Sequence, residues 1–245
     1  MSNHFDLSGK TAIVTGGSRG LGLAITRGLA LAGARVVIVA RGEPLEPVDF
    51  DFTFIPADLQ NADERAGLIE RVAESAGAVD ILFHCAGQQH RAPAVDFPVE
   101  NWSAILELHL TAAMDLSQQA ARHMQTRGNG KIILLSSIIG YQGGLMVPAY
   151  AAAKHGIIGL VQALANEWAA LGINVNGLAP GYFDTGVGQA VLQDAVRGPQ
   201  ILARIPAGRA GQGEDLRGAA IFLASSAANY VHGHTLVVDG GWLGR

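Results

Sequence analysis

The segment Thr15-Gly16-Gly17-Ser18-Arg19-Gly20-Leu21-Gly22 gives the strongest indication of the fold class of this chain. It stands between a short apolar, β-rich run at 11–14 and a helical pattern at 21–34. In an open parallel sheet, the turn from a strand into the following helix lies at the carboxyl ends of the strands, where ligands bind. Glycine lets the backbone turn tightly there, without a Cβ in the way. The order strand, glycine loop, helix therefore predicts the first unit of a doubly wound α/β sheet.

Strands and helices continue to alternate along the rest of the chain. Further apolar, β-rich runs predict strands at 35–40, 52–55, 81–85, 131–135, 173–178 and 235–238. Helical patterns separate them at 62–77, 99–125, 150–170 and 214–225. Buried strands that alternate with helices predict a parallel sheet with helices on both faces. Because no Pro-, Gly- or Ser-rich linker and no internal repeat divides the sequence, residues 1–245 are expected to form one domain.

Composition and charge exclude several classes of partner. Hydrophobic residues make up 49% of the chain and charged residues only 16%, which indicates a large core. The net charge of −4 and the lack of a basic run argue against nucleic-acid and anionic-membrane partners. No segment approaches the ~18 consecutive apolar residues of a membrane span. The N-terminal residues lack the pattern of a secretory signal, so a cytoplasmic protein is expected.

The single cysteine, Cys85, excludes an intramolecular disulfide. The sequence has no CxxC motif and no zinc-type Cys/His spacing, so no metal site is predicted. Cys85 is interpreted as a small buried apolar residue rather than a nucleophile, because no activating partner is evident.

The glycine loop also predicts a dinucleotide site. The start of the following helix supplies unpaired N–H groups and a partial positive charge, which suit a pyrophosphate. The spacing of Gly16, Gly20 and Gly22 gives T-G-x-x-x-G-x-G rather than the common G-x-G-x-x-G. An ordinary glycine-rich turn is the alternative, but the strand before the loop and the helix after it favour a dinucleotide.

Tyr150 and Lys154 stand four residues apart at the start of an alanine-rich helix. Positions i and i+4 share one helical face, so the phenol and the ammonium can approach each other. The cation is expected to lower the phenol's pKa, so that Tyr150 exchanges a proton with an alcohol or carbonyl while hydride moves to or from a nicotinamide. Ser137, just past the strand at 131–135, is expected to hold the substrate oxygen. An exposed Tyr/Lys pair without a role is the alternative.

In their order along the chain, these motifs resemble the short-chain dehydrogenase/reductase family over essentially its whole length. Asp58-Leu59, Ala86-Gly87 and the segment from Asn176 to Thr185 belong to the same set. The resemblance implies a seven-stranded Rossmann-type sheet, NAD(P) as cofactor and a homo-oligomer, here expected to be a homotetramer. The cofactor-binding residues that it implies are Gly16, Ser18, Arg19, Gly20, Leu21, Gly22, Arg41, Asp58, Leu59, Ala86, Gly87, Tyr150, Lys154, Pro180, Gly181 and Thr185.

Three of these residues have specific roles by resemblance. Asp58 is implied to contact adenine, Lys154 also to hold the nicotinamide ribose, and Thr185 to bind the carboxamide. Taken alone, Asp58 is better interpreted as a turn or helix-cap aspartate.

The C-terminal half is similar to one branch of the family, the 2-dehydro-3-deoxy-D-gluconate 5-dehydrogenases, with gluconate 5-dehydrogenases as relatives. The similar segments are Tyr141-Gln-Gly-Gly-Leu-Met-Val-Pro-Ala-Tyr150, Ala165-Asn-Glu-Trp168, Ala179-Pro-Gly-Tyr-Phe-Asp-Thr185, Ile205-Pro-Ala-Gly-Arg209 and Val238-Asp-Gly-Gly-Trp-Leu243. This similarity implies a sugar acid as the small-molecule substrate. Arg91, with His90, is expected to pair with its carboxylate, because the planar guanidinium fork matches that group. A solvated surface arginine is the alternative. Residues 183–205 are expected to form a lid over the substrate.

Two departures from the family pattern concern histidines. The segment after the fourth strand reads His84-Cys85-Ala86-Gly87 where the family usually has Asn-Asn-Ala-Gly. His109 stands where the family has an asparagine in its fourth helix. Because histidine titrates near neutral pH, His109 is interpreted as a catalytic proton relay, with a polar core histidine as the alternative. Trp242, near the C-terminus, is expected to anchor a subunit interface, or else to close the core of its own subunit.

The choice between NAD and NADP depends on the end of the second strand. An acidic residue there selects NAD, whereas a basic one accommodates the NADP phosphate. Arg41 follows the strand at 35–40 and Arg19 lies in the glycine loop, which favours NADP. Glu43 and the similar branch, which mostly uses NAD, favour NAD.

Two other functions remain open. One is a reductase of 3-oxoacyl thioesters on an acyl carrier protein, although the acidic balance offers such a carrier no basic docking surface. The other is a non-catalytic, dinucleotide-binding regulatory protein, against which the complete set of Ser137, Tyr150 and Lys154 argues.

Overall fold

The computed structural model describes residues 3–185 and 187–245, and its named strands lie in one sheet. The strands are β1 (Thr11–Thr15), β2 (Arg35–Ala40), β3 (Phe52–Pro56), β4 (Ile81–His84), β5 (Gly130–Leu135), β6 (Ile173–Pro180) and β7 (Thr235–Val238). Their order across the seven-stranded sheet is β3-β2-β1-β4-β5-β6-β7, and every neighbouring pair is parallel. The predicted Rossmann-type, doubly wound fold is therefore confirmed.

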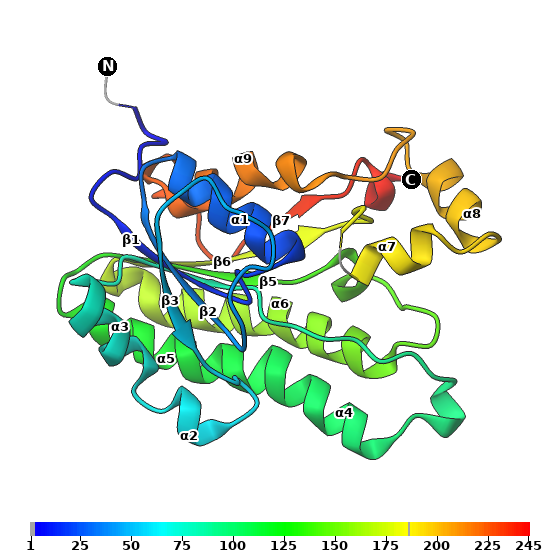
Figure 1. Cartoon of the computed structure of the whole chain (residues 1–245), viewed down its shortest axis with the longest axis horizontal. Coiled ribbons are helices and arrows are strands. Elements are labelled where there is room, and N and C mark those ends of the chain that lie inside the picture. Colours follow the sequence, from blue (N-terminus) through cyan, green and yellow to red (C-terminus); the bar gives the residue numbers. More distant parts are fainter. Residues whose placement is uncertain (1–2, 186) are drawn as a thin grey trace.

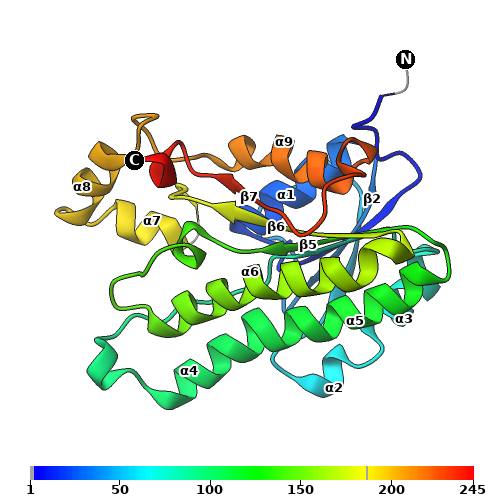
Figure 2. The same ribbon diagram turned by 180° about the vertical axis from the view of Figure 1, so that it is seen from behind.

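Helices cover both faces of the sheet (Figures 1 and 2). α1 (Gly20–Leu31) and α9 (Gly213–Ala224) pack on one face, and α3 (Leu68–Ala76), α5 (Ala112–Gln125) and α6 (Pro148–Trp168) pack on the other. The remaining α-helices are α2 (Ala62–Arg65), α4 (Val99–Leu106), α7 (Val187–Leu192) and α8 (Arg197–Arg204). In residues 3–185 and 187–245, no helix combines the length and apolar character needed to cross a bilayer.

The alternation of side chains along each strand builds two hydrophobic cores. Successive residues of a strand point to opposite faces of its sheet. On β1, Ile13 belongs to the core under α3, α5 and α6, whereas Ala12 and Val14 belong to the core under α1 and α9. Because both faces are covered in this way, most residues of the strands are apolar.

Two of the predicted helical stretches are interrupted. The stretch 62–77 divides at Gly67, whose φ of +63° favours glycine, into α2 and α3. The stretch 99–125 consists of α4, a π-helical turn at Glu107–Thr111, and α5. The other predicted elements differ from the observed ones only at their ends.

Trp242 closes the core of its own subunit. Its side chain is buried, with the ring 4.8 Å from that of Tyr182 and 4.0 Å from the guanidinium of Arg204. Its indole N–H donates to Gln142 Oε1 at 3.2 Å. The expectation that Trp242 anchors a second subunit is therefore wrong, because the indole is already covered by its own chain.

β1 and β4 end at a buried polar pair. His84 Nδ1 lies 2.9 Å from Thr15 Oγ1, and His84 Nε2 lies 3.2 Å from the Leu108 carbonyl oxygen. Because a carbonyl can only accept, Nε2 carries the hydrogen and Nδ1 accepts from the threonine hydroxyl. Thr15 Oγ1 in turn accepts from the N–H groups of Cys85 and Ala86, each at 3.2 Å. The neutral imidazole thus ties the loop after β4 to β1 and to the π-helical turn.

This arrangement makes stability depend on pH. Burial, together with the charge of Lys154, lowers the pKa of His84 from 6.5 to about 4. Between these values the unfolded chain binds a proton and the folded chain does not. The stabilisation is therefore complete above pH 6.5 and is lost as the pH falls through about 4, by about 3 kcal/mol in full. We expect the free energy of unfolding of the His84→Asn variant, measured with urea, to fall less between neutral pH and about pH 4.5 than that of the wild-type protein. An identical change in both proteins would contradict this assignment.

Candidate active site

A cleft of about 1200 Å³ lies at the carboxyl ends of the strands and contains nearly every site residue that the sequence predicts. All the residues expected to bind the cofactor line it, from Gly16 in the glycine loop to Thr185 after β6. Ser137, Tyr150, Lys154, His109 and Arg91 line it as well. His90 does not line it, because its ring packs edge-on against Phe97 at 5.5 Å.

The glycine loop leaves room for a phosphate group. Gly16 has a φ of +65°, and a Cβ on it would lie 2.7 Å from the Ala86 Cα. A Cβ on Gly22 would collide with the Gly16 carbonyl oxygen, so glycine also allows α1 to begin close to the loop. Arg19, the residue before α1, makes no side-chain hydrogen bond to the helix start. The N–H groups of the first turn are thus available to an anion, as a pyrophosphate requires.

The other end of the cleft fits the nicotinamide half of a dinucleotide. Thr185 Oγ1 is buried and has no hydrogen-bond partner within the part of the chain that the structure describes. A buried hydroxyl without a partner is costly, so it suits a ligand amide. Asp58 also lines the cleft, and its Oδ1 accepts from the Gln60 N–H at 3.0 Å. This contact agrees with the interpretation of Asp58 as a turn aspartate. The contact of Asp58 with adenine stays a prediction.

α6 brings Tyr150 and Lys154 together at the floor of the cleft. Lys154 Nζ lies 5.4 Å from the centroid of the Tyr150 ring and donates to the Leu135 carbonyl oxygen at 2.5 Å. Ser137 Oγ accepts from the Ile139 N–H at 3.2 Å. Its own hydroxyl hydrogen is therefore free for the Tyr150 oxygen or for a substrate oxygen.

Burial controls the protonation of this pair. It raises the pKa of Tyr150 above 10.0, and the hydrogen bond with Ser137 offsets only part of that rise. It also lowers the pKa of Lys154 to about 7. The expectation that Lys154 lowers the phenol's pKa is therefore wrong for this structure, because desolvation dominates and the amine itself is only partly charged near neutral pH. A phenol that keeps its proton is suited to donating that proton to a carbonyl.

His109 lies on the π-helical turn beside Tyr150. The two rings meet edge-on with their centroids 5.4 Å apart, and His109 Nε2 lies 2.8 Å from the Gln88 carbonyl oxygen. The Gln88 N–H also donates to Nε2 at 3.1 Å, and Nδ1 is buried without a partner among the described residues. Burial, with the charge of Lys154, holds the pKa of His109 well below 6.5, so the ring is neutral. A Cβ on Gly87 would lie 2.5 Å from this ring, which explains glycine at that position.

Arg91 and Arg197 of α8 both line the cleft. Arg91 Nη2 donates to the Leu145 carbonyl oxygen at 3.1 Å. Burial, and after it the charge of Arg197, lowers the pKa of Arg91, so the two cations lie near each other. The charges of both arginines lower the pKa of the exposed Asp194 carboxylate, after its backbone hydrogen bonds with Arg197 and Val196. Among the described residues, Asp194 forms no ion pair within 4.0 Å with either arginine. Sequence reasoning missed Arg197, because the segment 183–205 carries no motif that singles it out.

Comparisons with known proteins agree with this geometry. A family model described as enoyl-(acyl carrier protein) reductase matches residues 16–243. The 2-dehydro-3-deoxy-D-gluconate 5-dehydrogenase of Bacillus subtilis (strain 168) is 45% identical, over 98% of this chain and 97% of its own.

Solved structures share both the fold and the sequence. A putative 2-deoxy-D-gluconate 3-dehydrogenase from Agrobacterium tumefaciens with bound NADP has a TM-score of 0.93 at 45% identity, covering 100% of both chains. A gluconate 5-dehydrogenase from Burkholderia cenocepacia J2315 in complex with NADP and tartrate has a TM-score of 0.93 at 39% identity, covering 99% of this chain and 98% of its own. The chain belongs to the short-chain dehydrogenase/reductase family of NAD(P)-dependent oxidoreductases.

Proposed function

We propose that this protein transfers hydride between NADP and a secondary alcohol or ketone of a sugar acid such as 2-dehydro-3-deoxy-D-gluconate. The observation that carries the proposal is one cleft with three parts. It has a glycine-lined phosphate site at one end, and the buried Ser137 and Lys154 lie at its floor with the half-buried Tyr150. Beside them, two arginines face the substrate space. The relatives named for sugar-acid oxidation and the neighbours with bound NADP support it.

The chain's own residues handle the proton and the substrate oxygen. When bound, the nicotinamide supplies or accepts the hydride. Ser137 donates a hydrogen bond to the substrate oxygen, and the Tyr150 hydroxyl gives its proton to that oxygen as a carbonyl becomes an alcohol. In the reverse direction the phenol oxygen accepts the proton. Lys154 holds the ribose, and the unpartnered His109 Nδ1 provides the next site on a proton path beside Tyr150.

The remaining assignments belong to the same proposal. Arg91 and Arg197 pair with the substrate carboxylate, and His90 has no direct role because it lies outside the cleft lining. Arg41 and Arg19 hold the NADP 2′-phosphate. Residues 183–185 and 187–205 form the substrate lid, and residue 186 of the predicted lid lies outside the described residues. We further propose that the protein is a single-domain, cytoplasmic protein and that it forms a homotetramer, the assembly that the family resemblance implies.

The activity of Tyr150→Phe tests the chemistry. We expect its kcat for reduction of 2-keto- and 5-keto-sugar acids to fall by about 10³-fold or more, because the proton donor is lost. The Kd for NADPH should stay within about twofold, because the ring and its packing remain. The matched control is Tyr230→Phe, whose ring is fully exposed. NADPH absorbance with a panel of keto-sugar acids and acetoacetyl thioesters measures the outcome. Preference for the thioesters would replace the sugar-acid substrate with an acyl one, and tight cofactor binding without turnover would indicate a regulatory protein.

Variants of the two arginines test the carboxylate site. Replacing either Arg91 or Arg197 with Gln should raise KM for acidic keto-sugars about tenfold or more, because a charge-assisted hydrogen bond is lost. KM for neutral keto-sugars should change little, and kcat should change little for both. Arg245→Gln, at the exposed C-terminus, removes the same charge away from the cleft. An equal effect on acidic and neutral substrates would argue against the proposed pairing.

Arg41→Ala tests the cofactor assignment. Losing one arginine contact to the 2′-phosphate should lower kcat/KM for NADP by about 10- to 100-fold and leave kcat/KM for NAD nearly unchanged. Glu43→Gln is the control with the opposite change of charge, because it removes a negative charge from the same part of the cleft and should not weaken NADP binding. A strong preference of the wild-type enzyme for NAD would refute the role given to Arg41.

A further inference from the structure

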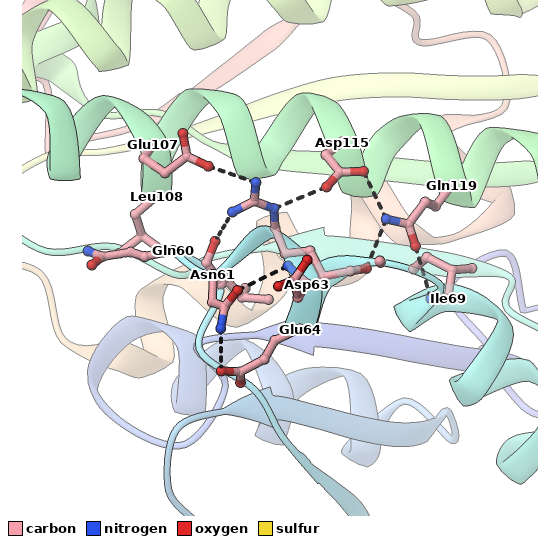
Figure 3. A network of polar contacts seen from close by, with 12 residues as sticks. Gln60, Asn61, Asp63, Glu64, Ile69, Glu107, Leu108, Asp115 and Gln119 are labelled. Carbon is pink, nitrogen blue, oxygen red and sulfur yellow. Dashed lines mark hydrogen bonds and ion pairs between the residues drawn. The ribbon is translucent and has the colours of Figure 1, made fainter.

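Arg65, the last residue of α2, is a buried cation that bridges three groups. Its Nη2 lies 2.7 Å from Glu107 Oε1 and its Nε 3.0 Å from Asp115 Oδ2, and its Nη1 donates to the Leu59 carbonyl oxygen at 2.5 Å. Only 3% of the residue is exposed. Figure 3 shows Glu107, Asp115 and Gln119 on the side of their helix that faces the segment of Asn61 to Ile69. Arg65 therefore joins α2 to the long helical stretch that carries His109.

The far side of the bridge is itself fixed by a second residue. Gln119 Nε2 donates to Asp115 Oδ1 at 2.9 Å and to the Arg65 backbone carbonyl at 3.0 Å. Each polar group of the cluster thus has a partner, as a buried charge requires. A fully paired network of this kind favours one geometry over its alternatives.

That geometry depends on the π-helical turn. Glu107 and Asp115 stand eight positions apart and enclose the rest of the turn Glu107–Thr111. In a regular α-helix, residues at this spacing are rotated by about 80° from each other around the axis. A π-helical turn takes up one extra residue, which reduces the rotation to about 20°. The widened turn thus brings both carboxylates to the face where one guanidinium reaches them.

The turn carries groups of the active site. Its Leu108 carbonyl accepts from His84, and its His109 ring lies against Tyr150 with Nδ1 unpartnered among the described residues. A π-helical turn is rare, and a relaxed α-helix would rotate one carboxylate away from Arg65 and leave a buried charge partly uncompensated. The cation therefore opposes relaxation of the turn.

We propose that Arg65 is a positioning residue for the reaction. By binding Glu107 and Asp115 together, it holds the π-helical turn that presents His109 to Tyr150. Its contact with the Leu59 carbonyl also ties this turn to the loop at the predicted adenosine end of the cleft. The catalytic part of this inference rests on the proposed role of His109.

The test removes one charge of the bridge at a time. Glu107→Gln and Asp115→Asn keep the size of each side chain but remove the charge that pairs with Arg65. In each variant we expect faster amide hydrogen exchange in the peptide that spans 107–112. We also expect kcat to fall by about tenfold, with the Kd for NADPH within about twofold of wild type. Glu100→Gln is the matched control, because Glu100 is exposed on α4 and has no contact with Arg65 among the described ion pairs. Unchanged exchange in both variants would overturn the proposal.

A double-mutant cycle separates positioning from a general loss of stability. If the bridge acts through His109, Glu107→Gln should lower kcat in the wild-type background and have no further effect in the His109→Gln background. The same fold-loss in both backgrounds would overturn the positioning role. If His109→Gln alone keeps wild-type kcat, the relay proposed for His109 fails. The amide hydrogen exchange of the peptide that spans 107–112 then still decides whether Arg65 holds the π-helical turn.

Discussion

Desolvation of polar side chains at the carboxyl ends of β1, β4 and β5 is the constraint on which the site depends. His84, His109, Tyr150 and Lys154 all lie where water is largely excluded, and burial is the first cause of each of their pKa shifts. Backbone carbonyls satisfy three of them, from Leu108, Gln88 and Leu135. The floor of the cleft therefore disfavours the charged form of each of these side chains. Groups that are neither firmly charged nor strongly hydrated can exchange protons with little reorganisation.

The charged residues of the cleft lie away from this floor. The side chains of Arg19, Arg41 and Arg91 are exposed at the surface of the cleft. An anionic dinucleotide and an anionic sugar acid would then contact solvated arginines at their charged ends. Their reacting atoms would meet in the neutral region between. This separation lets charge select the ligands without lowering the capacity of Tyr150 to hold its proton.

Most of the fold could be predicted from the sequence, because it depends on local patterns. The apolar runs set the strands, and the glycine loop identified the edge of the sheet that carries the cleft. Protonation could not be predicted in the same way. The spacing of Tyr150 and Lys154 says that they share a helical face, but it says nothing about the solvent around them, so the direction of the phenol's pKa shift was wrong. Arg197 was missed for a related reason, because its place in the cleft depends on how α8 packs and not on any local motif.

The π-helical turn shows the same limit in the backbone. Residues 107–111 have no glycine or proline that would interrupt a helix, and their sequence reads as a continuation of α4. The turn agrees instead with a contact from Arg65, which is distant in sequence. A buried ion pair usually adds little net stability over a hydrophobic replacement, but it can select one geometry among several. An apolar residue in place of Arg65 would leave the regular α-helix as the favoured form, because no group would then require both carboxylates on one face. The position of His109 beside Tyr150 would be lost with the widened turn, even in a protein of equal or greater stability.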